Sequence, residues 1–159
     1  MNNSYITILI ESLEKKSKIL DKVIDTDAKQ TEIISKEEPD MEALSKNMDV
    51  IGELALELEK LDDGFESVYA KVREELLENK EAHREEIKRM QQLITEVTEK
   101  SVKVQTTEAR NKNKVVQMFK NERRKLGARR QSARVLNDYK YMVNSLDKQS
   151  EPYFLDSKK

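Results

Sequence analysis

Apolar residues recur along the first part of the chain at the three- and four-residue spacing of an α-helix. A polar interruption occurs at Lys16 and Ser17. Pro39 disfavours helical backbone at the residue before it and suits the first turn of a new helix. We therefore predict a helix over about 4–36 and, after a short connection, an antiparallel neighbour. The apolar positions of this first helix are Ile6, Leu9, Leu13, Leu20, Val23, Ile24 and Ile34.

The next segment alternates spacings of three and four almost strictly, which is the seam pattern of a coiled coil. It predicts a second helix over about 40–78. The sequence LDDGF at 61–65 contains a glycine, which costs about 1 kcal/mol in a helix interior relative to alanine, so we expect a kink or a break there. The seam residues are Met41, Leu44, Met48, Ile51, Leu54 or Ala55, and Leu58.

A third helical pattern covers about 85–126 and has polar residues at three positions of its apolar stripe. These are Ser101, Glu108 and Asn111. A polar seam residue fixes the register of packed helices at a cost in stability. Gly127 is a typical stop signal after a helix. The stripe itself contains Ile87, Met90, Leu93, Ile94, Val97, Val104, Val115, Met118 and Phe119.

These patterns predict an all-α protein. We expect a long antiparallel helical hairpin or three-helix bundle over 1–126, with coiled-coil-like packing, followed by a less ordered C-terminal tail over 127–159. The composition agrees, because 38% of the residues are charged and the chain has only 3 Gly and 2 Pro. So few turn-forming residues exclude a fold of many strands.

The tail carries one apolar stripe at helical spacing and a separate apolar trio near its end. Two interpretations of the stripe remain open: it binds the helix of a partner, or it docks on the protein's own body. We predict partner binding by both groups of residues. The stripe and its flanks consist of Val135, Leu136, Tyr139, Met142, Val143 and Leu146, and the trio consists of Tyr153, Phe154 and Leu155.

The net charge of −1 hides a strong asymmetry along the chain. Residues 110–159 carry +9, so residues 1–109 carry −10. The run 112–134 alone carries +8 and could neutralise phosphates, which makes nucleic-acid binding one hypothesis. The alternative is attraction to the acidic first hundred residues. No nucleic-acid motif surrounds the run, and Phe119 is its only aromatic residue, so we favour the second interpretation.

No residue pattern indicates catalysis, a metal site or a cofactor. His83 is the only histidine, and Lys80 stands where a bundle di-iron motif needs glutamate. We expect His83 to be an exposed helix residue among charged neighbours. The chain contains no cysteine, which suits a reducing compartment, and no apolar stretch of about 20 residues. We therefore expect a cytoplasmic protein that is not an enzyme and does not insert into a membrane.

The layout resembles the FlgN family of flagellar type III export chaperones over nearly the whole chain. The resemblance rests on YITILIESLEKKSKILDKV, on DMEALSKNMDVIGEL, on LDDGFESVYAKVREEL and on IKRMQQLITEVTEKSVKVQTTEARNK, followed by a basic region and YFLDSKK. Its most suggestive points are the helix start at 40–44, the cluster Glu108, Arg110 and Asn111, and the end of the chain at 153–159.

This resemblance implies a chaperone that binds hook-associated flagellar proteins, keeps their terminal helices soluble and delivers them to the export gate. It also implies that the C-terminal part binds the substrate, so we expect residues from about 128 to 159 to fold on binding. The positive charge of the basic run at 112–134 is larger than this role requires. A different hypothesis is a structural coiled-coil adaptor that forms a homodimer through the seam at 41–58.

Overall fold

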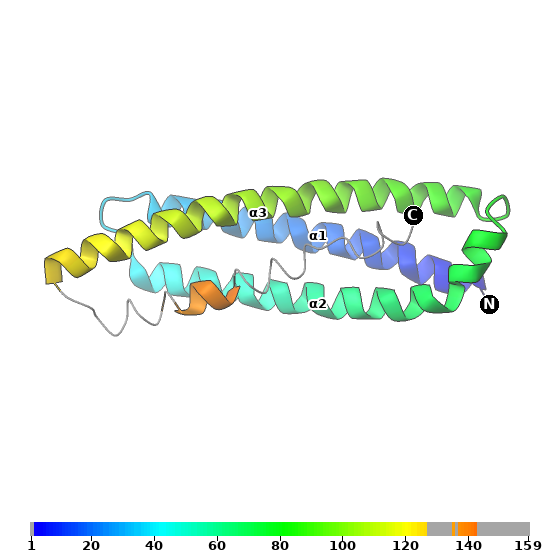
Figure 1. Ribbon diagram of the computed structural model, residues 1–159, viewed down its shortest axis with the longest axis horizontal. Coiled ribbons are helices and arrows are strands. Elements are labelled where there is room, and N and C mark those ends of the chain that lie inside the picture. Colours follow the sequence, from blue (N-terminus) through cyan, green and yellow to red (C-terminus); the bar gives the residue numbers. More distant parts are fainter. Residues whose placement is uncertain (1, 127–134, 136, 143–159) are drawn as a thin grey trace.

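Three long helices form an extended bundle in the computed structural model, which describes residues 2–126, 135 and 137–142 (Figure 1). Helix α1 spans Asn2–Ile34, α2 spans Met41–Glu78 and α3 spans Arg84–Leu126. No strand occurs among these described residues. The predicted all-α fold with three long packed helices is therefore confirmed. None of the described helices is long and apolar enough to cross a membrane.

The turn between α1 and α2 is fixed by a helix cap. The Asp40 side chain accepts hydrogen bonds from the backbone N–H groups of Glu42 (3.0 Å) and Ala43 (3.1 Å). These bonds satisfy two of the amide donors that every helix start leaves without a partner. The sequence DMEAL therefore starts α2, and Pro39 keeps α1 from continuing into it.

Helix α2 continues through Gly64, so the helix does not break where the sequence suggested. The residues beside it explain why: Asp62 and Phe65 are both buried in contacts with the rest of the bundle. Packing of this kind outweighs the cost of about 1 kcal/mol for one glycine. Helix α2 ends at Glu78, and its connection to α3 lies at 79–83, in a part of the sequence that is rich in charged residues.

Apolar side chains form two core clusters along the bundle. The first cluster lies around the α1–α2 turn and the second around the α2–α3 connection. The first contains Ile19, Leu20, Val23, Ile34, Leu44, Met48, Ile51, Leu54, Ala55, Leu58, Val97, Val104, Val115, Phe119, Val135, Tyr139 and Met142. The second contains Ile6, Leu9, Leu13, Phe65, Val72, Leu76, Met90, Leu93 and Ile94. The coiled-coil seam of α2 is therefore buried inside this chain.

A buried ion pair separates the two clusters. Lys16 Nζ lies 2.7 Å from Asp62 Oδ1, and both side chains are almost fully buried. Next to them Lys100 Nζ donates to Ser17 Oγ (2.7 Å). The polar interruption in the sequence of α1 is thus matched by polar residues on both neighbouring helices.

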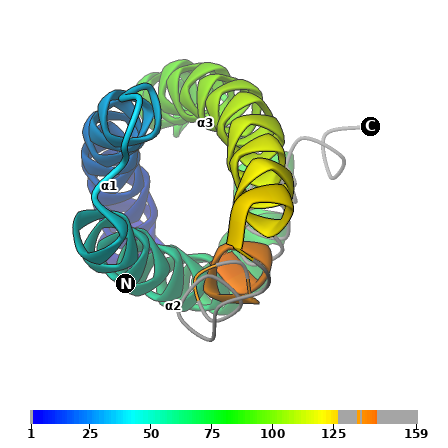
Figure 2. The same ribbon diagram turned by 90° about the vertical axis from the view of Figure 1, so that its left-hand side faces the viewer.

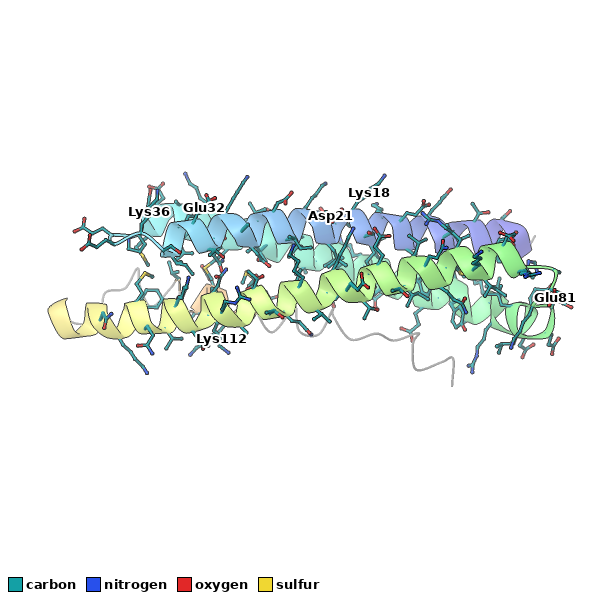
Figure 3. All side chains as sticks on the ribbon, turned by 90° about the horizontal axis from the view of Figure 1, so that it is seen from above. Lys18, Asp21, Glu32, Lys36, Glu81 and Lys112 are labelled. Atoms are coloured by element: carbon teal, nitrogen blue, oxygen red, sulfur yellow. The ribbon has the colours of Figure 1, made fainter. Side chains whose placement is uncertain are left out.

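The three helices do not pack equally on one another. Helix α1 packs closely along both α2 and α3, whereas the backbones of α2 and α3 hardly anywhere come as close to each other. Figure 2 shows the consequence, with α1 on one side and the short helix at 135–142, in orange, lying between α2 and the end of α3. Charged side chains such as Lys18, Glu32 and Lys112 point away from the bundle (Figure 3).

We predict that the ion pair between the clusters costs more stability than it supplies. Burial raises the pKa of Asp62 although Lys16 acts in the opposite direction. Lys16→Met alone leaves a buried carboxyl group without its partner and should lower the free energy of unfolding by about 3–5 kcal/mol. The double variant Lys16→Met, Asp62→Leu should restore wild-type stability or exceed it, as measured by urea unfolding.

The exposed pair Lys46 and Glu42 is the matched control. It also joins a lysine to a carboxylate, 3.4 Å apart, but both side chains are about three-quarters exposed. Lys46→Met should change stability by less than about 1 kcal/mol. A double variant at 16 and 62 no more stable than the single variant would contradict the prediction.

Candidate functional site

The described part of the predicted partner-binding stripe lies against this chain's own core. Val135 and Met142 are 1% exposed and Tyr139 is fully buried. All three belong to the first core cluster, together with residues of α1, α2 and α3. The helix at 135–142 therefore serves as a fourth helix at this end of the bundle, in the space between α2 and α3 (Figure 2).

The described residues of the stripe thus dock on the protein's own body, which is one of the two interpretations left open by the sequence, and binding of a partner stays a prediction. The backbones of α2 and α3 lie farther from each other than from α1, and the stripe packs in the space between them. A partner can reach these three side chains only if the helix leaves its position. The other predicted contact residues lie outside the described part of the chain or have no described side chain: Leu136, Val143, Leu146, Tyr153, Phe154 and Leu155.

Tyr139 connects the fourth helix to a buried polar layer. Its hydroxyl donates to the backbone carbonyl of Glu108 on α3 (2.9 Å). The polar side chains at this level of the three long helices, together with Tyr139, are called the Asp27 layer. The layer consists of Asp27, Gln30, Thr31, Asn47, Glu108, Asn111 and Tyr139.

Amide side chains join the three long helices within the Asp27 layer. Gln30 Nε2 donates to Asn47 Oδ1 (3.0 Å), and Asn47 Nδ2 donates to the carbonyl of Thr26 (2.9 Å). On the other side of α1, Thr31 Oγ1 donates to Asn111 Oδ1 (3.0 Å) and Asn111 Nδ2 donates to the carbonyl of Asp27 (3.3 Å). Each of these bonds holds only at one longitudinal register of the helices.

At the centre of the layer two carboxyl groups, Asp27 and Glu108, are buried next to each other. They are 1% and 2% exposed. Burial, followed by the hydrogen bond and the charge of Glu108, raises the pKa of Asp27 to about 10. The pair therefore holds a proton at neutral pH, because two neighbouring like charges cannot both ionise in a dry interior.

A pair of carboxyl groups that share a proton resembles a catalytic dyad, but this pair has no access to substrate. Burial of both groups favours a structural role in aligning α1, α3 and the fourth helix. The same surroundings, with burial as the main cause, raise the pKa of Tyr139 far above its usual range. The tyrosine therefore remains a donor at every physiological pH.

The sequence analysis identified one side of this layer and missed the other. Glu108 and Asn111 stood out as polar seam residues of α3. Asp27 and Gln30 of α1, which did not stand out, continue the three-four spacing that runs through Leu20, Val23 and Ile34. Extending the seam through polar positions would have found them.

His83 is buried rather than exposed, in the connection between α2 and α3. Its Nε2 lies 3.3 Å from Glu75 Oε1. The hydrogen bonds from His83 and Asn79 lower the pKa of Glu75. Within the described part of the chain, no group of three or more histidine, aspartate or glutamate residues could hold a metal ion.

The space between α2 and α3 continues beyond the fourth helix toward the other end of the bundle. Here it contains a pocket of about 270 Å³ with an apolar wall. We call it the α2–α3 pocket. It is lined by Phe65, Tyr69, Leu76, Leu77, Lys80, Ile87, Met90, Gln91 and Ile94.

The basic run is only partly described. Lys112, Lys114 and Lys120 are exposed on the last third of α3, so they do not fold back onto acidic residues of the bundle. The side chains from Glu122 to Arg134 lie outside the described set. Nucleic-acid binding therefore stays an untested hypothesis.

Comparison with known proteins adds no relative. No protein-family model, no curated protein and no solved structure matches this chain. The resemblance to FlgN chaperones stays a prediction from the sequence pattern. The proposed function rests on this resemblance and on the helix that docks between α2 and α3.

The shared proton makes stability depend on pH in a predictable direction. The pKa of Asp27 is higher in the folded state than in the unfolded chain, so its contribution is fully present below about pH 4 and is lost as the pH rises toward about 10. Asp27→Asn keeps the shape and a donor but does not titrate. Between pH 8 and pH 5, wild type should gain up to about 1.4 kcal/mol per pH unit relative to Asp27→Asn in urea unfolding. A difference that does not vary with pH would refute the shared proton.

We also predict that the hydroxyl of Tyr139 stabilises the docked helix. Tyr139→Phe keeps the ring in the core but removes the donor to Glu108, and should lower the free energy of unfolding by about 1 kcal/mol. Tyr141, two residues on and 67% exposed, gives the control: Tyr141→Phe should change stability by less than about 0.5 kcal/mol. Equal effects of the two substitutions in thermal unfolding would show that the buried bond contributes nothing.

Proposed function

We propose that this protein is a non-catalytic chaperone of the FlgN type, which acts in the cytoplasm and binds the terminal helices of hook-associated flagellar proteins before export. The flagellar substrate and the delivery to an export gate rest on the resemblance of the sequence. The mode of binding rests on the geometry of the fourth helix.

The observation that carries the proposal is the docking of a short amphipathic helix between α2 and α3. Val135, Tyr139 and Met142 provide its contact surface and are buried. A helix of this length is marginal without tertiary contacts. It can therefore exchange its contacts with the bundle for similar contacts with a helix of a partner.

Such an exchange would leave both apolar surfaces covered. When the helix at 135–142 leaves, its stripe can pair with an amphipathic helix of the substrate, while the space between α2 and α3 accepts another apolar face of that substrate. Helix-in-groove recognition of this kind depends on apolar residues at helical spacing and tolerates different residues at the positions between them. Methionine and tyrosine both suit such adaptable surfaces. These features support a protein that shields exposed helices.

The proposal predicts that the C-terminal region determines affinity for the substrate. Truncation after Gly127, Val135→Asp and Met142→Asp should each weaken binding of a hook-associated protein at least tenfold, because a charge on the stripe opposes burial in either position. Isothermal titration with the purified partner measures this. Asn137→Asp, on the exposed side of the same helix, should leave affinity within about twofold.

Circular dichroism of each variant separates loss of the binding surface from loss of the fold. The variants should retain the helical signal of α1, α2 and α3. Unchanged affinity in a folded truncated protein would place the binding surface elsewhere, and absence of binding by the wild-type chain to any hook-associated protein would refute the flagellar substrate.

A further inference from the structure

The space between α2 and α3 is filled at one end of the bundle and open at the other. The fourth helix covers the first core cluster, whereas the α2–α3 pocket stands over the second. Its apolar wall includes the stacked rings of Phe65 and Tyr69, whose centroids are 6.0 Å apart. A stacked aromatic pair beside a pocket of this size is suited to take up another aromatic side chain.

The chain is long enough for its C-terminal residues to reach this pocket. Leu126 ends α3, and Tyr139 contacts Glu108 in the middle of that helix, so residues 137–142 lie back alongside α3. Tyr153 comes fourteen positions after Tyr139, and Ile94 comes fourteen positions before Glu108. Ile94 lines the pocket. At about 1.5 Å per residue in a helix, or more in an extended chain, Tyr153 can reach the level of Ile94.

The chemistry of the end of the chain matches that of the pocket. Tyr153, Phe154 and Leu155 form an isolated apolar trio between Glu151 and Asp156. Most of the side chains that line the pocket are apolar, and Lys80 is the one charged residue among them. An apolar trio with carboxylates on both sides therefore meets an apolar cavity with one positive charge.

Three apolar residues bury too little surface to bind tightly from solution. Attachment changes this, because a short linker holds the trio at an effective concentration of the order of millimolar. Only ten residues connect Met142, which is packed in the core, with Tyr153. A weak contact is then sufficient to keep the pocket occupied.

We infer that Tyr153, Phe154 and Leu155 occupy the α2–α3 pocket of their own chain. Any helix that binds in this space has to displace the trio. The inference concerns this chain alone and does not depend on the proposed function.

Disulfide cross-linking tests the contact directly, because the chain has no cysteine of its own. The variant Phe154→Cys, Leu77→Cys places one thiol in the trio and one at the pocket. Leu77 lines the pocket and is 48% exposed. Mild oxidation should form a disulfide within one chain, seen as a monomer of altered mobility on a non-reducing gel.

The matched control replaces Leu56, which is 50% exposed on the same helix but does not line the pocket. The pair Phe154→Cys, Leu56→Cys should cross-link at least tenfold more slowly than the pair at 154 and 77. Equal rates for the two pairs would overturn the inference. A cross-link that joins two chains instead of one would also overturn it.

Tryptophan fluorescence gives a second readout that needs no oxidation, since the chain contains no tryptophan. Phe154→Trp should emit at the short wavelength of a buried indole. Adding Leu77→Lys should shift that emission to the long wavelength of an exposed indole, and adding Leu56→Lys should not. Exposed emission from Phe154→Trp alone would contradict the inference.

Discussion

Helix α1 is the shared neighbour on which the whole bundle depends. Each long helix has one apolar stripe to bury, and α1 packs closely along both α2 and α3, whose own backbones lie farther apart. The side of the bundle opposite α1 is therefore short of apolar cover. The docked helix at 135–142 and the open α2–α3 pocket are two outcomes of this single constraint, one at each end of the molecule.

Buried polar residues give the long seam a single register. Leucine, isoleucine and valine repeated at three-four spacing pack almost equally well after a slip of one heptad. A slip would separate Lys16 from Asp62, which would leave charged groups buried without partners, and it would also separate the buried carboxyl groups Asp27 and Glu108. Because Tyr139 bonds to the backbone of Glu108, the same layer also fixes where the fourth helix can dock.

The sequence was sufficient to predict the three long helices, but it was insufficient to predict which surfaces pack against one another. Apolar spacing identified three long helices, and Pro39 with Asp40 located the first turn, because both signals are local. Gly64 was misleading, since buried Asp62 and Phe65 hold its helix together through contacts that are distant in sequence. The stripe at 135–142 was recognised as a binding face, but its occupant depends on how far apart α2 and α3 lie. That distance is a property of the assembled bundle and of no single segment.

The central claim is that the free protein holds residues 135–142 as a docked fourth helix. Amide hydrogen exchange of the full chain, followed by mass spectrometry of peptides that cover these residues, tests it most directly. The account predicts exchange slower than that of an unstructured peptide by at least about a hundredfold, since the amides are hydrogen-bonded within a helix that packs on the core. Exchange of these amides at the rate of an unstructured chain, while α1, α2 and α3 remain protected, would contradict it.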